Sequence, residues 1–270
     1  MTFGARLDAA IAERGPFCVG IDPHAALLEE WGLGDDVGGL EFFALRVVEA
    51  VAPHVSVVKP QSAFYERFGS RGIAVLERVI AESRAAGALV LLDVKRGDIG
   101  STSQAYADAY LDPSSPLASD AVTVSPFLGF GSLDPFIDTA RRHDAGVFVL
   151  ALTSNKEGPE VQHAYSVNGG TVAGTMLDHL RRLNADATPL GSFGAVVGAT
   201  IGATDEDLAF NGPVLAPGFG AQGGTIADVR RLFGSAAAVL PSSSREVLRL
   251  GPGPDLMRDF VLRTNHELRS

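Results

Sequence analysis

Eight short apolar runs, separated by segments with helical periodicity, constrain the fold of this chain more than any other feature. The runs lie at residues 16–22, 54–59, 89–95, 120–126, 146–152, 193–199, 212–217 and 236–241. Short runs composed mainly of apolar residues, without a polar residue at every second position, are typical of strands buried on both faces of a parallel sheet. Alternation of such strands with helices favours the same arrangement.

Amphipathic segments accompany these runs along the chain. They are predicted to be helical at residues 2–14, 41–52, 71–86, 104–111, 133–144, 171–184, 204–210, 225–233 and 255–268. Eight strand–helix units in 270 residues predict an α/β protein with one domain, residues 1–270, folded as a closed (β/α)₈ TIM barrel. An open, doubly wound parallel sheet is the alternative.

Polar residues stand where the predicted strands end, which is the side of a barrel that carries active sites. These residues are Asp22, Lys59, Asp93, Lys95, Ser154 and Gln222. Asp93 and Lys95 are two apart on one strand, so alternation directs both side chains to the same face. A matched acid and amine could be a purely structural ion pair or a catalytic one.

Lysine usage favours the catalytic interpretation. The chain has only three lysines, Lys59, Lys95 and Lys156, against nineteen arginines. Two of the three close apolar runs. An amine differs from a guanidinium because it can lose and regain a proton near neutral pH. The two lysines at strand ends therefore indicate chemistry.

Composition limits the classes of partner. A net charge of -10 and a pI of about 5.0 argue against nucleic-acid binding, although a local cationic cluster could still hold a small anion. The single cysteine, Cys18, excludes an internal disulfide and is predicted to lie in the core. No apolar run has the length of a membrane span, and the N-terminus lacks a secretory pattern, so we expect a cytoplasmic protein.

The segment GFGAQG, residues 218–223, fits the dinucleotide-binding pattern G-x-G-x-x-G. That pattern belongs in the first strand–helix unit, however, and here it falls in the seventh. In a barrel, glycines after the seventh strand fit a phosphate site, for which Arg245 would supply a cation. A flexible loop with a surface arginine is the alternative. The histidines and the one cysteine show no metal-binding spacing, so no metal is expected.

The segment from Asp93 to Ile99 resembles the D-x-K-x-x-D-I signature of the orotidine 5′-phosphate decarboxylases. The resemblance extends over almost the whole chain, through Asp22, Lys59 and the segment PGFGAQGG at 217–224, and is strongest to the longer bacterial members. It implies decarboxylation of orotidine 5′-phosphate to UMP in de novo pyrimidine biosynthesis, with no cofactor. It also implies this nucleotide and a second copy of the chain as partners, and no nucleic acid or membrane.

The resemblance also implies roles for individual residues. The charged catalytic tetrad would be Lys59, Asp93, Lys95 and Asp98, with Lys95 as the proton donor. The substrate-binding residues would be Asp22 and Thr102 at the ribose, Ser154 at the pyrimidine, Pro217, Gly218, Gly220 and Gln222 in the loop at the phosphate, and Arg245 as the phosphate cation. Asp98 and Thr102 would act across the interface of a homodimer.

Two positions depart from the pattern. Gly100 stands where many members have proline, and PSSSRE replaces the usual glycine–arginine turn around Arg245. Three other functions remain open. Magnesium-dependent relatives, such as keto-gulonate phosphate decarboxylase or hexulose-phosphate synthase, would need another acid after Lys59, where Pro60 and Gln61 stand. A Schiff-base aldolase would use Lys95 or Lys59, and a non-catalytic sensor would only bind a phosphorylated ligand.

Overall fold

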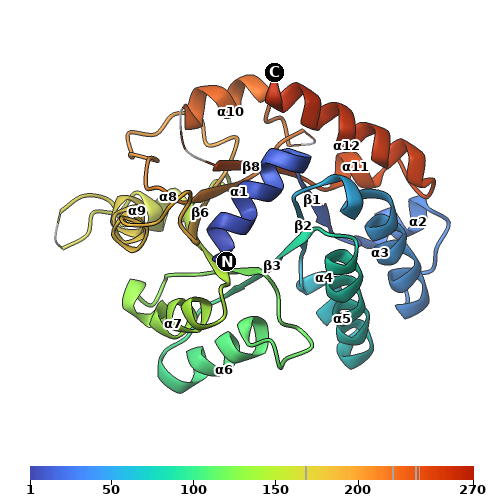
Figure 1. Cartoon of the computed structure of the whole chain (residues 1–270), viewed down its shortest axis with the longest axis horizontal. Helices are drawn as coiled ribbons and strands as arrows, with labels where there is room; N and C mark the ends of the chain where they lie inside the picture. The colour runs from blue at the N-terminus through green and yellow to red at the C-terminus, as the bar shows by residue number, and fades with distance from the viewer. Residues whose placement is uncertain (168, 221, 235, 237) are drawn as a thin grey trace.

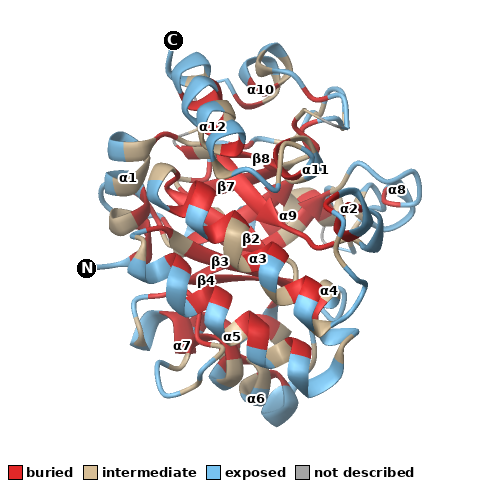
Figure 2. Ribbon diagram, turned by 90° about the vertical axis from the view of Figure 1, so that its right-hand side faces the viewer, coloured by how far each residue is buried: buried red, intermediate tan, exposed pale blue. Residues whose placement is uncertain are grey.

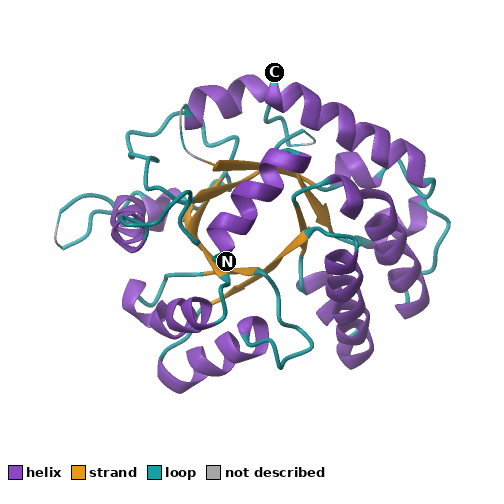
Figure 3. Cartoon of the chain, in the orientation of Figure 1, coloured by secondary structure: helices purple, strands orange, loops and turns teal. Residues whose placement is uncertain are grey.

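The strands form one closed parallel barrel. The structure, a computed structural model, describes residues 1–167, 169–220, 222–234, 236 and 238–270. The strands follow one another around the barrel in chain order, and pairing of the last with the first closes it (Figure 3). They are β1 (Cys18–Ile21), β2 (Val57–Pro60), β3 (Leu89–Arg96), β4 (Ala121–Val124), β5 (Gly146–Leu152), β6 (Phe193–Val197), β7 (Pro213–Pro217) and β8 (Ala238–Ser243). The predicted TIM barrel is confirmed, and the open sheet is excluded.

Helices surround the barrel (Figure 1) and turn their buried residues toward it (Figure 2). The longer ones are α1 (Phe3–Arg14), α3 (Val37–Val51), α5 (Gly69–Ala85), α6 (Gly100–Leu111), α7 (Asp134–Arg142), α9 (Val172–Leu183), α10 (Ile226–Phe233) and α12 (Pro254–Arg269). The sequence did not predict the short helices, which are α2 (Ala25–Glu30), α4 (Ala63–Glu66), α8 (Pro159–Gln162), α11 (Arg245–Leu248) and the 3₁₀ turns η1 (Ala52–His54) and η2 (Phe130–Leu133). No helix in the described ranges is long and apolar enough to cross a membrane.

Helix α1 lies across one end of the barrel (Figure 3). Its buried residues Phe3 and Leu7 join a cluster of side chains from the barrel interior. The ring of Phe3 meets the ring of Phe148 edge-on, with the centroids 6.1 Å apart. Because Phe148 stands near the start of β5, α1 closes the end opposite to the one where active sites lie.

A buried carboxylate ties β3 and β4 together at this closed end. Asp120, directly before β4, accepts hydrogen bonds from Arg6 Nη1 at 2.5 Å, Arg84 Nε at 3.1 Å and the Val90 amide at 2.9 Å. Burial alone would raise the pKa of Asp120, but Arg84 and Arg6 outweigh it and hold that pKa below its ordinary value. The ionised carboxylate therefore joins α1, α5, β3 and β4.

The helix predicted at 204–210 is wrong, because all of these residues are described and none is helical. Side chains take the backbone partners that a helix would need. Asp207 Oδ1 accepts from the Ala209 amide at 2.9 Å, and Arg181 Nη2 donates to the Asp207 carbonyl at 3.1 Å. β6 and β7 are thus joined by an irregular segment.

Two residues in segments for which the sequence made predictions, Ala221 and Ala237, lie outside the described residues. The predicted eighth strand covered 236–241, and the structure places β8 from Ala238, with Ala237 not described. Ala221, inside the glycine-rich segment 217–224, is likewise not described.

Cys18 is buried in the barrel interior as predicted, and burial is the main reason that its pKa is raised to about 11.

Candidate active site

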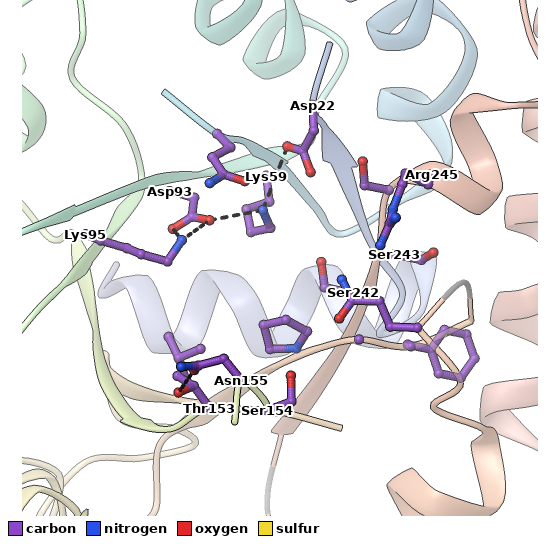
Figure 4. Close-up of a pocket in the computed structure, with 18 of the residues that line it drawn as sticks. Asp22, Lys59, Asp93, Lys95, Thr153, Ser154, Asn155, Ser242, Ser243 and Arg245 are labelled. Atoms are coloured by element: carbon purple, nitrogen blue, oxygen red, sulfur yellow. Dashed lines mark hydrogen bonds and ion pairs between the residues drawn. The ribbon is translucent and has the colours of Figure 1, made fainter. Parts of the chain in front are cut away.

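A pocket of about 510 Å³ opens where the C-terminal ends of the strands converge. Four of its charged lining residues come from the first three strands, namely Asp22 after β1, Lys59 on β2, and Asp93 and Lys95 on β3. They form a continuous row (Figure 4). This is the edge of the barrel at which the sequence placed them, because parallel strands that end in polar residues bring those residues to one face.

Asp93 stands between two ammonium groups. Lys95 Nζ lies 2.7 Å from both carboxylate oxygens of Asp93, and Lys59 Nζ lies 3.3 Å from Oδ2. Lys59 Nζ is also 4.0 Å from Asp22 Oδ1. The side chain of Lys59 is only 8% exposed, whereas that of Lys95 is 44% exposed. Lys59 is therefore fixed within the row, while Lys95 reaches the open pocket.

The charges around Asp93 and Lys59 shift the pKa values of these two buried groups toward their ionised forms. Burial raises the pKa of Asp93 on its own, but Lys59 and Lys95 outweigh it, and the result is a pKa of about 2. Burial likewise lowers the pKa of Lys59, but Asp22 and Asp93 outweigh it and raise that pKa above its ordinary value. Near neutral pH Asp93 is therefore a carboxylate and Lys59 an ammonium group, so this buried pair presents a strong fixed field to anything in the pocket.

β3 is irregular where it carries the two catalytic candidates. Leu92 pairs with Val122 and Arg96 with Val124, so three residues of β3 lie opposite the single residue Thr123. Lys95 itself has a φ of 47°, in the left-handed region that non-glycine residues seldom adopt. Strain of this kind is found where surrounding structure enforces it, often at active sites.

The remaining candidates divide into two groups. Five line the same pocket as the charged row, namely Ser154, Pro217, Gly218, Gln222 and Arg245. Asp98, Thr102 and Gly220 are not among the lining residues. Gly220 and Gly218 have φ values of 72° and 96°, and a Cβ on Gly220 would collide with the Glu246 carboxylate. The glycines thus shape the loop.

Sequence reasoning missed several polar groups of the pocket. Ser243 and Ser244, at the end of β8, line it with hydroxyls that have no hydrogen-bond partner among the described residues. Asp22 Oδ1 is unpartnered in the same sense. Buried polar atoms left without partners are rare, and these three belong to residues that line the pocket. The signal was present in the segment PSSSRE, where three serines follow a strand that is otherwise apolar.

Thr123 was also missed, although a hydroxyl in the middle of the apolar run 120–126 was a visible signal. Its Oγ1 donates to Asp93 Oδ1 at 2.7 Å. The same oxygen accepts from the amides of Val94 at 3.1 Å and Lys95 at 3.0 Å.

Within the described ranges, no group of three or more His, Cys, Asp or Glu side chains is arranged to hold a metal ion.

The chain is similar over nearly its whole length to proteins of one known family. The family model "Orotidine 5′-phosphate decarboxylase / HUMPS family" matches residues 15–249. A Nocardioides protein named orotidine 5′-phosphate decarboxylase is 85% identical, with 99% of each chain covered. A Streptomyces coelicolor protein of the same name is 62% identical, over 99% of this chain and 97% of its own. The crystal structure of a candidate orotidine 5′-phosphate decarboxylase from Streptomyces avermitilis has a TM-score of 0.96 at 61% identity, covering 99% of this chain and 95% of that one.

Proposed function

Because the chain belongs to the orotidine 5′-phosphate decarboxylase / HUMPS family, we propose that its conversion of orotidine 5′-phosphate to UMP runs through the row formed by Asp22, Lys59, Asp93 and Lys95. The observation that carries this proposal is the exposed ammonium of Lys95, 2.7 Å from a buried carboxylate at the edge of the pocket. We also propose that residues 1–270 act as one catalytic domain, since α1 packs against side chains of the barrel interior and α12 packs in the second core, which strand and helix residues form together.

The chemistry demands an electrostatic site. Breaking the bond between C6 and the carboxylate leaves an electron pair on an sp² carbon, with no neighbouring group to delocalise it. The barrier must fall by on the order of 20 kcal/mol, near the top of the enzymatic range. Lys95 suits this task, because its ammonium stabilises the developing negative charge and then transfers a proton from Nζ to C6. Solvent at the open pocket can return that proton to Lys95.

The other charges of the row prepare Lys95. With a pKa of about 2, Asp93 is a carboxylate at neutral pH and holds the Lys95 ammonium by both oxygens. Lys59 lies between the carboxylates of Asp93 and Asp22, so its positive charge offsets part of their negative charge and links the two residues. Because these groups are fixed before substrate arrives, little reorganisation is needed at the moment of reaction. We assign Asp22 to a ribose hydroxyl, because it lines the pocket and its Oδ1 has no hydrogen-bond partner in the described structure.

The substrate phosphate is proposed to lie between the ends of β7 and β8. Gly218 and Gln222 line the pocket from one side, and Ser243, Ser244 and Arg245 line it from the other. Backbone amides in glycine-rich turns, serine hydroxyls and a guanidinium are all suited to phosphate oxygens. We assign Ser154, two residues after β5, to the pyrimidine, because it lines the same pocket and lies away from Arg245 in the view of Figure 4.

Arg245→Ala tests the phosphate assignment. Loss of a charge-assisted contact costs about 2–3 kcal/mol, so KM for orotidine 5′-phosphate should rise roughly 30- to 140-fold. The slow reaction of orotidine, which lacks the phosphate, should be nearly unchanged. Arg249→Ala is the matched control, because Arg249 lies one turn further on and pairs with Glu30 at 3.7 Å. Equal losses on both substrates would make Arg245 structural.

A second copy of the chain is proposed to complete the site. Asp98 and Thr102 do not line their own pocket, and Asp98 accepts only from the adjacent Ile99 amide among the bonds of the described residues. Ile99, next to Asp98, is exposed, and so are Phe127 and Leu128 on the segment after β4. The two segments approach each other at Gly97 and Ser125. Exposed apolar side chains on segments that leave an incomplete site are typical of a protein interface. A two-fold dimer would complete both sites reciprocally.

The overall proposal is tested by adding orotidine 5′-phosphate in the presence of a metal chelator. We expect near-ultraviolet absorbance to fall at the same rate with and without the chelator, because every charge in the proposed chemistry comes from side chains. The released product should be UMP by chromatography. A strict requirement for added magnesium would instead assign the chain to the metal-dependent chemistry of the superfamily.

A further inference from the structure

The irregular pairing of β3 with β4 poses a backbone problem. Three residues of β3, from Asp93 to Lys95, lie opposite Thr123 alone. The strand ladder cannot supply partners for all of their amides, and buried amides without partners destabilise a structure. The hydroxyl of Thr123 meets this need, because it accepts from both the Val94 and the Lys95 amides.

The same hydroxyl links the backbone to the charged row. While Oγ1 accepts from the two amides, its hydrogen is directed to Asp93 Oδ1 at 2.7 Å. One side chain therefore fixes the backbone from which Lys95 extends and the carboxylate that Lys95 binds. The left-handed φ of 47° at Lys95 is held at this point. From this backbone position Lys95 Nζ lies 2.7 Å from both oxygens of Asp93.

We propose that Thr123 is a positioning residue for the decarboxylation, holding Lys95 and Asp93 in register without touching the substrate. This inference rests on the proposed function of Lys95. Thr123 is only 1% exposed and is not among the residues that line the pocket. Its contribution must therefore pass through Lys95 and Asp93. Displacements of about 1 Å in such groups can lower a rate by roughly 100-fold.

Thr123→Val removes the hydroxyl and preserves the shape of the side chain. The Val94 and Lys95 amides then lose their acceptor, and Asp93 loses one donor while keeping both lysines. We expect kcat to fall by about 10- to 100-fold. KM and the affinity for UMP, measured by calorimetry, should change less than about threefold, because the phosphate and ribose contacts remain in place.

Two further variants make the test specific. Thr123→Ser keeps the hydroxyl and should recover kcat to within about threefold of the wild-type value. Thr139→Val is the matched control, since Thr139 on α7 is also buried and its Oγ1 also accepts two hydrogen bonds, from Gln104 and Arg142. The control should lose stability without losing kcat. Thermal melting of all three variants shows whether each is folded before its activity is compared.

The outcomes separate this inference from the proposal on which it rests. A wild-type chain that does not decarboxylate orotidine 5′-phosphate would contradict the proposed function itself. If the wild-type chain is active and folded Thr123→Val has the same kcat, the positioning role is overturned while the function stands. An equal loss in Thr123→Ser and Thr123→Val would also overturn it, because the hydroxyl would then not be the group that matters. A crystal structure of Thr123→Val should show Lys95 outside the left-handed region.

Discussion

Lys95→Ala should reduce kcat for orotidine 5′-phosphate by on the order of 10⁴-fold or more, the largest effect expected of any single substitution. Its ammonium is the exposed cation of the row and lies beside Asp93, at the pocket edge. Alanine removes both the charge that stabilises the carbanion and the proton that quenches it. Lys59 cannot substitute, because it is 8% exposed and is bound to Asp93.

Binding and chemistry separate in this variant. UMP should still bind to Lys95→Ala, since Asp22, Ser154 and the proposed phosphate groups remain. Lys95→Arg distinguishes charge from proton transfer, because a guanidinium keeps the charge but does not release a proton near neutral pH. We expect it to bind nucleotide and to remain nearly inactive. Lys156→Ala is the control, since Lys156 is 92% exposed, and it should be fully active. Turnover above a tenth of normal in Lys95→Ala would exclude Lys95 as the acid.

Mixing two inactive variants should restore about a quarter of the wild-type activity. Lys95→Ala and Asp98→Ala are each expected to be inactive alone, because every site of either homodimer lacks one member of the tetrad. After random exchange, half of the dimers are mixed. In a mixed dimer one site has lost both residues and the other has both intact, because Asp98 is proposed to act in the neighbouring subunit's site.

The readout of this experiment is the rate of the mixture relative to an equal amount of wild-type chain. Exchange must be established independently, for example by native mass spectrometry of differently tagged subunits. A mixture that has exchanged and gains no activity would show that Asp98 acts within its own chain. Two Lys95→Ala populations with different tags serve as the control and should gain nothing.

The barrel and the charged row could be predicted from the sequence, because short segments of it show where each buried strand lies and which polar residues stand at its end. An apolar run identifies a buried strand, and closure of the barrel brings the residues after each run to one edge. Asp93 and Lys95 could therefore be placed together from their spacing alone. The helix predicted at 204–210 failed because Arg181, on another element, binds the Asp207 carbonyl and competes with helical pairing.

The function of Thr123 could not be predicted in the same way. A threonine in the run 120–126 is compatible with any buried strand, and its importance depends on how β4 is aligned with β3. That alignment is not regular, and hydrophobic pattern specifies register only where the ladder is regular. The unpartnered hydroxyls of Ser243 and Ser244 likewise became evident only when the ends of β1, β7 and β8 were brought together.

The carboxylate of Asp120 has a consequence at the opposite end of the barrel. It precedes β4 directly, and it also accepts from the Val90 amide at 2.9 Å, near the start of β3. Three residues further along each of these strands stand Thr123 and Asp93. Because the two strands are locked together at their starts, the surplus length of β3 must be taken up beyond Leu92, at the site itself. The contacts of Asp120 at the closed end thus fix the alignment of β3 with β4. They thereby determine where β3 can bulge and where the amine of Lys95 enters the pocket.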